Sequence, residues 1–200
     1  MRRPSAQLVI SAYTQGIFPM AHPEEDGRIY WYAPDPRAIL PLEDFHVPRR
    51  LAQTVAAEPF EICINRDFDA VIAGCAAPRK TQKKTWISSG LAEAYAELHR
   101  LGFVHTVEAW CDDELVGGLY GVAIGGFFAG ESMFYRKTDA SKICLVHLVR
   151  RLRRRNFTLL DIQFMTDHLA QFGAREIPQE EYERRLAAAI ELPCEFVGDQ

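Results

Sequence analysis

Two polar side chains interrupt an otherwise apolar stretch, Leu159-Leu160-Asp161-Ile162-Gln163. In an extended strand the side chains alternate between faces, so this spacing places Asp161 and Gln163 on the same face. Burying an acid and an amide costs free energy unless partners pair with them. The pattern therefore permits two interpretations: a functional pair in a site, or an internal salt bridge to an arginine beside a satisfied amide.

Glu131 is a second candidate, in the segment Gly130-Glu131-Ser132-Met133-Phe134. Because it follows the apolar residues 127–129, we expect it at the end of a buried strand, a common place for ligands in α/β sheets. The alternative is a strand-end carboxylate in water. Five of the ten residues from Gly117 to Gly126 are glycines. They indicate a bulge or a close approach of substrate, and they do not form a GxGxxG that opens a helix.

The sequence contains no metal-binding motif and no segment typical of a membrane or secreted protein. The five cysteines are widely spaced, with no CxxC pair, and the six histidines contain no HExxH motif. This pattern is typical of a reduced, cytoplasmic protein without a metal site. The 200 residues contain no apolar run of 18 or more, and no apolar stretch follows the basic N-terminus. We therefore expect no transmembrane helix and no secretory signal.

The charge is uneven along the chain. The net charge is −4, but residues 79–155 carry +5 between acidic flanks of −3 and −6. This middle part contains two basic clusters, Arg79 to Lys84 and the arginine run 150–155. Such clusters can guide a polyanion; the alternative is a solvated helix face. Trp86 follows Lys83 and Lys84 closely, and an aromatic ring beside basic residues suits a nucleotide end.

Periodicity and capping residues predict most elements of the fold. Five prolines between residues 17 and 42 exclude a long helix there and predict short strands and loops instead. From residue 104 onward the predicted order is strand, strand, strand, helix, strand, helix. A strand that follows a crossover helix pairs in parallel with an earlier strand, so the sequence predicts a mixed α/β sheet. The predicted helices span 4–15, 49–57, 68–76, 88–102, 139–155, 166–172 and 178–190, and the predicted strands span 60–64, 104–111, 115–124, 127–133 and 157–164.

Seven short motifs occur in order along the chain, and together they are specific. They are Gly16-Ile17-Phe18-Pro19-Met20, Pro34-Asp35-Pro36-Arg37, Thr85-Trp86-Ile87, residues 115–122, residues 130–134, Ala140-Ser141-Lys142 and Asp161-Ile162-Gln163. The set closely resembles the bacterial leucyl/phenylalanyl-tRNA–protein transferase family, over about residues 8–190. Two departures stand out: the Gly-Gly-Asp-Leu-Ser segment that usually precedes the first helix is missing, and many members carry tryptophan where Met20 stands.

The resemblance implies an α/β fold with a small N-terminal α/β domain, residues 1–58, and a GNAT-like acyltransferase domain, residues 59–200. It implies transfer of Leu or Phe, and less well Met, from aminoacyl-tRNA to the N-terminal Arg or Lys of acceptor proteins. The modified proteins would enter N-degron proteolysis. The enzyme would be a cytoplasmic monomer that needs no cofactor, no metal and no membrane.

The resemblance also implies roles for individual residues. Asp161 and Gln163 would be the catalytic pair, and Glu131 would bind the cationic side chain of the acceptor. The donor side chain would lie in an apolar pocket formed by Met133, Phe128, Leu119 and Met20. The tRNA would contact Trp86, Arg49, Lys83 and Lys84.

Two other functions remain open from the sequence. An acyl-CoA-dependent N-acyltransferase of the GNAT type would need glycine-rich backbone donors for the pyrophosphate. The link between the third strand and its helix, residues 135–139, has no glycine, which counts against it. A non-catalytic RNA-binding module would explain the basic clusters but would not require Asp161 and Gln163.

Overall fold

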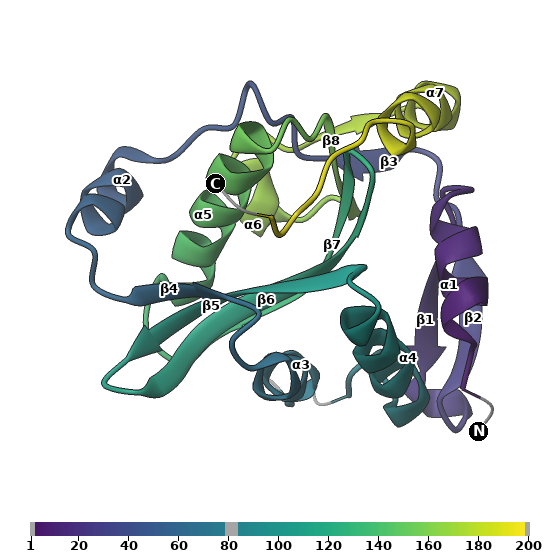
Figure 1. The fold of residues 1–200 in the computed structure, drawn as a ribbon, viewed down its shortest axis with the longest axis horizontal. Helices are drawn as coiled ribbons and strands as arrows, with labels where there is room; N and C mark the ends of the chain where they lie inside the picture. The colour runs from purple at the N-terminus through teal and green to yellow at the C-terminus, as the bar shows by residue number, and fades with distance from the viewer. Residues whose placement is uncertain (1–2, 79–83, 199–200) are drawn as a thin grey trace.

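The computed structural model describes residues 3–78 and 84–198 (Figure 1). A two-stranded and a seven-stranded sheet carry the fold, with helices on both faces of the larger sheet. The helices are α1 (Ala6–Tyr13), α2 (Arg49–Ala56), α3 (Phe68–Ala76), α4 (Ser89–Arg100), α5 (Ala140–Arg154), α6 (Asp167–Ala170), α7 (Gln179–Ile190) and a 3₁₀ turn at Pro23–Glu25. The strands are β1 (Phe18–His22), β2 (Arg28–Tyr32), β3 (Arg37–Ile39), β4 (Glu61–Ile64), β5 (Val104–Cys111), β6 (Glu114–Ile124), β7 (Phe127–Tyr135), β8 (Leu159–Gln163) and β9 (Arg175–Ile177).

The local signals for helix ends operate as predicted. The side chains of Asp67, Ser88 and Thr166 each accept a hydrogen bond from a backbone N–H in the first turn of α3, α4 and α6. Gly102 and Gly173 lie in the left-handed region, with φ of 81° and 89°, which lets the chain turn away after α4 and α6. These caps fix helix boundaries close to the predicted ones.

The large sheet has the strand order β4-β5-β6-β7-β8-β3-β9. Neighbouring strands are antiparallel except β7 and β8, which are parallel and joined by α5. The predicted mixed sheet, with a parallel pair around a crossover helix, is therefore confirmed. The order also contains β9, which the sequence did not predict. Strand β3 lies between β8 and β9, and it belongs to the proline-rich stretch 17–42 that predicts short strands.

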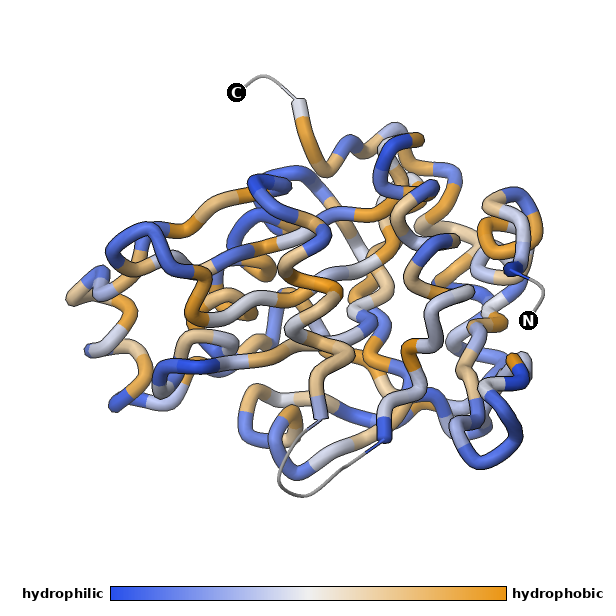
Figure 2. The backbone as a smooth tube through the Cα atoms, turned by 90° about the horizontal axis from the view of Figure 1, so that it is seen from below, coloured by the Kyte–Doolittle hydropathy of each residue, from blue (hydrophilic) through white to orange (hydrophobic). Residues whose placement is uncertain are grey.

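Two hydrophobic cores cover the two faces of this sheet. One core packs α1, α3 and α4 against one face, and the other packs α2, α5 and α6 against the opposite face. In Figure 1, α5 lies above the sheet, α3 and α4 lie below it, and α1 with the β1–β2 hairpin stands beside α4. Hydrophilic and hydrophobic residues alternate along the helices in Figure 2, as expected for helices that bury one face.

The front of the chain contributes to both sheets. The hairpin of β1 and β2 forms the two-stranded sheet, whereas β3 extends the seven-stranded sheet. Leu51 and Val55 of α2 are buried in the core on the α5 side. The division into domains after residue 58 stays a prediction. Within the described residues no helix combines the length and apolarity that crossing a bilayer requires.

Candidate functional site

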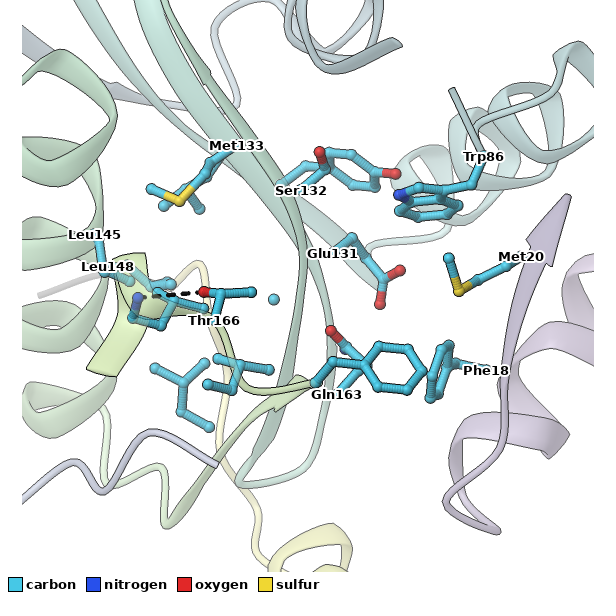
Figure 3. A pocket seen from close by; sticks show the side chains of 17 residues that line it. Phe18, Met20, Trp86, Glu131, Ser132, Met133, Leu145, Leu148, Gln163 and Thr166 are labelled. Atoms are coloured by element: carbon cyan, nitrogen blue, oxygen red, sulfur yellow. Dashed lines mark hydrogen bonds between the residues drawn. The ribbon is translucent and has the colours of Figure 1, made fainter. Parts of the chain in front are cut away.

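A cavity of about 230 Å³ lies where the two parallel strands separate. Strands β7 and β8 pair at only three positions, the last of which joins Ala129 to Asp161. Beyond this point the strands diverge, and residues from both line the cavity (Figure 3). The lining residues are Phe18, Met20, Trp86, Leu119, Tyr120, Gly130, Glu131, Ser132, Met133, Leu145, Leu148, Leu160, Ile162, Gln163, Phe164, Thr166 and Leu169.

The cavity extends through the gap between the strands, so its two sides differ. In Figure 3, Met133 and the α5 residues Leu145 and Leu148 lie on one side, and Met20 and Trp86 lie on the other. Glu131 lies between the two groups. We call the side formed by Met133, Leu119, Leu145 and Leu148 the apolar compartment. A compartment lined by Leu and Met side chains favours an apolar group of adaptable shape.

A β-bulge directs Glu131 toward the cavity. Tyr120 of β6 pairs with Ser132, but the next residue, Gly121, pairs with Gly130, so Glu131 has no partner on β6. A bulge of this kind changes the direction of one side chain and bends the strand. Gly121 is required beside it, because a Cβ atom there would lie 2.3 Å from the carbonyl oxygen of Ala129. The bulge that the glycine-rich segment predicted is therefore confirmed.

Two tyrosines hold the Glu131 carboxylate. The Tyr13 hydroxyl donates to Oε1 at 2.7 Å, and the Tyr95 hydroxyl donates to Oε2 at 3.1 Å. The pKa of Glu131 is raised to about 7, mainly by burial; the charge of Asp161 also raises it, while the tyrosine hydrogen bonds and Arg37 lower it. Among the described lining residues, Glu131 is the only charged one. The cavity is thus suited to a cation beside an apolar group.

Asp161 is engaged in a fully buried salt bridge. Arg37 donates from Nε to Oδ1 at 2.9 Å and from Nη2 to Oδ2 at 2.7 Å. The backbone N–H of Gln163 also donates to Oδ1, and the Tyr182 hydroxyl donates to Oδ2, both at 2.9 Å. Each carboxylate oxygen therefore accepts two hydrogen bonds, which is its normal capacity. The internal salt bridge to an arginine, left open by the sequence, is present.

Arg37 also contacts several other elements of the fold while it pairs with the Asp161 carboxylate. Its Nη1 donates to the Gly16 carbonyl at 2.8 Å, and its guanidinium carbon lies 4.7 Å and 4.4 Å from the ring centres of Phe18 and Tyr182. The arginine is only 1 % exposed. It thereby joins the start of β1, strand β3 and α7 to the end of β8. Such a pair is costly to break, because removing one partner leaves a buried charge uncompensated.

Gln163 ends β8 in a strained backbone conformation. Its φ is +60°, a left-handed value that non-glycine residues adopt rarely. The hydrogen bond from its N–H to Asp161 holds this conformation. The side-chain amide of Gln163 is oriented with its nitrogen toward two backbone carbonyls. In this orientation Nε2 donates to the carbonyl of Gly130 at 2.9 Å and to that of Ile162 at 3.1 Å. The structure thus brings Asp161 and Gln163 together, with Gln163 lining the cavity and Asp161 behind it.

The other predicted site residues fall into two groups. Met20, Leu119, Met133 and Trp86 line the cavity with Glu131 and Gln163. Phe128 is not among the described lining residues: its ring is fully buried and lies 5.2 Å from that of Phe196, in the core on the α5 side.

The predicted tRNA contacts are dispersed. Arg49 is exposed at the start of α2, and Lys84 is exposed and forms a salt bridge with Glu24 at 3.6 Å. Lys83 lies outside the described residues. Trp86 is held beside β1 by its carbonyl, which accepts a hydrogen bond from the Ala21 N–H at 3.1 Å.

Some arginines of the run at the end of α5 form hydrogen bonds within the fold, and others add exposed positive charge. Arg151 donates to the Phe196 carbonyl, Arg153 to the Leu42 carbonyl and Arg155 to the Gly198 carbonyl. These bonds fasten the C-terminal segment and the segment before α2. Arg150 and Arg154 are exposed and extend the basic surface.

No motif in the sequence marks the tyrosines around the site as functional. Tyr13 and Tyr95 occupy the apolar faces of their predicted helices, where a periodic pattern indicates core packing. Both are buried, as that pattern implies, but their hydroxyls meet at 2.9 Å and both bind Glu131. Nothing local in the sequence distinguishes such a tyrosine from one whose ring only packs.

The protein has a mixed α/β fold. Its cavity is suited to an apolar group beside a cation. Comparison with known families identifies the type. Residues 39–187 match the family model described as leucyl/phenylalanyl-tRNA protein transferase, and residues 2–35 match the model for the N-terminal domain of that family. The chain therefore belongs to the leucyl/phenylalanyl-tRNA protein transferase family, a family of aminoacyltransferases.

Individual relatives are similar over nearly the whole chain. A leucyl/phenylalanyl-tRNA–protein transferase of Phenylobacterium zucineum is 54% identical over 96% of this chain and 86% of its own length. One from Paramagnetospirillum magneticum is 50% identical over 95% and 91%. A solved C-terminal domain, DUF2156, from Agrobacterium fabrum is a distant likeness, with 11% identity and a TM-score of 0.49 over 94% of this chain and 69% of that one. The resemblance noted from the motifs, and the aminoacyltransferase class, are confirmed by the family match.

Proposed function

We propose that this protein transfers Leu or Phe, and less well Met, from aminoacyl-tRNA to the N-terminal Arg or Lys of acceptor proteins. The observation that carries the proposal is the cavity itself, which combines an apolar compartment with a single carboxylate. Membership of the family supports the reaction class. The modified N-terminus would mark acceptor proteins for N-degron proteolysis in the cytoplasm, and the enzyme would act as a monomer without cofactor or metal.

The apolar compartment is the proposed seat of the donor side chain. Its walls of Leu and Met are apolar, so they favour Leu and Phe over polar amino acids. Burying one such side chain contributes about 1.5–3 kcal/mol to binding. Met20 lies across the cavity from this compartment, where its flexible thioether could adjust to either donor.

Glu131 is the proposed anchor of the acceptor. A guanidinium or ammonium that approaches the carboxylate forms charge-assisted hydrogen bonds, which are stronger than neutral ones. Because its pKa is about 7, cation binding should favour the ionised form and lower this pKa. The proposed subsite therefore accepts Arg or Lys and excludes neutral N-terminal residues.

The chemistry requires little acid–base help. The amine nitrogen attacks the ester carbonyl of the aminoacyl-tRNA, the new C–N bond forms, and the ester C–O bond breaks. The ribose oxygen leaves with a proton, and the amine loses one. An α-amino group has a pKa of about 7.7–8.0, so a perfect base gains only about tenfold at pH 7. Correct positioning can supply up to about 7–11 kcal/mol.

Asp161 and Gln163 are therefore assigned to positioning. All four acceptor positions of Asp161 are occupied by Arg37, Tyr182 and Gln163, so taking a proton would require breaking a buried bond. Asp161 instead fixes the strained backbone of Gln163. The Gln163 amide, at the cavity wall, would orient the attacking amine through Oε1, because both Nε2–H groups already donate to the carbonyls of Gly130 and Ile162.

The tRNA would approach from the side of Trp86. This ring offers a stacking surface for the terminal base. Arg49, Lys83, Lys84, Arg150 and Arg154 are the proposed phosphate contacts, and they would make donor binding sensitive to salt.

A transfer assay tests the proposal directly. Labelled Leu-tRNA is mixed with the protein and with two peptides that differ only in N-terminal Arg or Ala. RNase-sensitive transfer to the Arg peptide alone is expected. Transfer to neither peptide, or acylation from acetyl-CoA instead, would contradict the proposal.

A further inference from the structure

One residue that lines the cavity, Tyr120, has a phenol oxygen that takes no part in the hydrogen bonds around Glu131 and Asp161. Tyr120 lies on β6, lines the cavity, and has a fully buried side chain. Among residues 3–78 and 84–198, its hydroxyl is the only buried side-chain nitrogen or oxygen without a hydrogen-bond partner. Proteins pair nearly all such groups, so an unpaired one on a residue that lines a cavity points to a ligand.

Tyr120 lies next to the carboxylate of the site. It pairs across the strands with Ser132, the residue after the bulged Glu131. Its ring meets that of Tyr95 edge-on, with centres 5.4 Å apart, and the Tyr95 hydroxyl donates to Glu131. Burial, together with the charges of Tyr95 and Glu131, raises the pKa of Tyr120 well above its usual value. The phenol therefore stays neutral and keeps lone pairs that can accept.

The chemistry around this hydroxyl selects a cation as its partner. Tyr13 and Tyr95 already direct their protons at Glu131, whose negative charge repels anions. An ammonium has three N–H donors and a guanidinium has five, and neither can accept a hydrogen bond. A carboxylate alone cannot use all of these donors. A neutral phenol oxygen beside it supplies a further acceptor without adding charge.

We propose that the Tyr120 hydroxyl is a second binding group for the cationic N-terminal side chain of the acceptor, beside Glu131. This inference rests on the proposed function. The planar guanidinium spreads its donors over a fork and can reach two acceptors at once, whereas the ammonium is a compact point charge. Tyr120 therefore favours Arg over Lys at the acceptor N-terminus.

The test compares two tyrosine variants in the full-length protein. Tyr120→Phe removes the buried hydroxyl, and Tyr135→Phe removes a hydroxyl from a side chain that is 67% exposed, as a matched control. For Tyr120→Phe we expect the KM for an N-terminal Arg peptide to rise roughly tenfold or more, given the strength of hydrogen bonds to charged groups. The KM for Leu-tRNA should not change, and the preference for Arg over Lys should shrink.

Thermal stability separates this role from a structural one. Phenylalanine removes an unpaired buried hydroxyl, so Tyr120→Phe should have a Tm equal to or above that of the unsubstituted protein. Tyr135→Phe should leave both KM values and the Tm unchanged. An unchanged acceptor KM in Tyr120→Phe would overturn the inference. A lowered Tm with equal changes in both KM values would also overturn it.

A binding measurement keeps this inference distinct from the proposed function. Calorimetric titration with argininamide needs no turnover. If the unsubstituted protein transfers no Leu but binds argininamide, and Tyr120→Phe loses that binding, the proposed function fails and the cation subsite stands. If argininamide binds neither protein, or binds both equally, the subsite is refuted.

Discussion

Replacing Glu131 with glutamine should stabilise the folded protein while it weakens acceptor binding. The pKa of Glu131 is raised from its ordinary value of 4.5 to about 7, chiefly by burial. Each pH unit of difference between the folded and unfolded states corresponds to about 1.4 kcal/mol. Ionised Glu131 therefore costs the folded state about 3 kcal/mol at pH 8, relative to a neutral group in the same place.

The sign of the pH dependence follows from the bound protons. Between pH 4.5 and 7 the folded state holds the Glu131 proton more firmly than the unfolded state does. The stability that this proton provides is complete below pH 4.5 and is lost as the pH rises through 7. Tyr13, Tyr95, Tyr120, Arg37 and Asp161 surround the carboxyl in both proteins, so their contributions largely cancel in the comparison.

Urea unfolding at pH 5, 6, 7 and 8 measures this effect. The advantage of Glu131→Gln over the unsubstituted protein should grow by about 2.5 kcal/mol across this range and level off above pH 8. Glu97→Gln, which removes a carboxyl that pairs with Arg3 near the surface, is the matched control and should show no such growth. A pH-independent difference for Glu131→Gln would refute the assignment of a raised pKa.

Three further outcomes follow from the site. Arg37→Met leaves the buried Asp161 charge unpaired and should cost about 3–5 kcal/mol in urea unfolding; a variant as stable as the unsubstituted protein would contradict the role of this pair. The transfer defect of Asp161→Asn should persist at pH 9, because its cause is lost positioning of Gln163; recovery of the rate at pH 9 would instead make Asp161 a base. Donor binding should weaken with salt, with a negative slope of log K against log salt concentration, and a flat plot would argue against the basic contacts.

The elements of the fold were predictable because their signals are local. Helix caps such as Asp67 and Thr166 act on residues within one turn, and apolar periodicity spans a few turns. The parallel pairing of β7 and β8 followed from chain order and the handedness of crossover connections. Strand β9 was not predicted, because its three residues are too few to show a periodic pattern. Strand β3, equally short, was predicted only as part of the proline-rich stretch with short strands, and its position in the large sheet was not.

The site was predictable only in part, because its contacts join distant parts of the chain. Glu131, Gln163 and Trp86 lie in recognisable motifs, and all three line the same cavity. Arg37 and Asp161 lie 124 residues apart, and no spacing rule relates them. The local hints were Asp161 inside an apolar strand, which suggested a salt bridge to some arginine, and a charged residue directly before the apolar Ala38-Ile39-Leu40. A buried charge at the start of a strand requires a partner, but the sequence does not say which.

Arginine and citrulline peptides test whether Glu131 selects the acceptor by its charge. Citrulline has nearly the shape of arginine but is neutral. The measurement is kcat/KM for transfer of Leu from Leu-tRNA to peptides with either residue at the N-terminus, for the unsubstituted protein and for Glu131→Gln. We expect a strong preference for arginine that largely disappears in Glu131→Gln. Equal rates for the two peptides in the unsubstituted protein, or an undiminished preference in the variant, would contradict it.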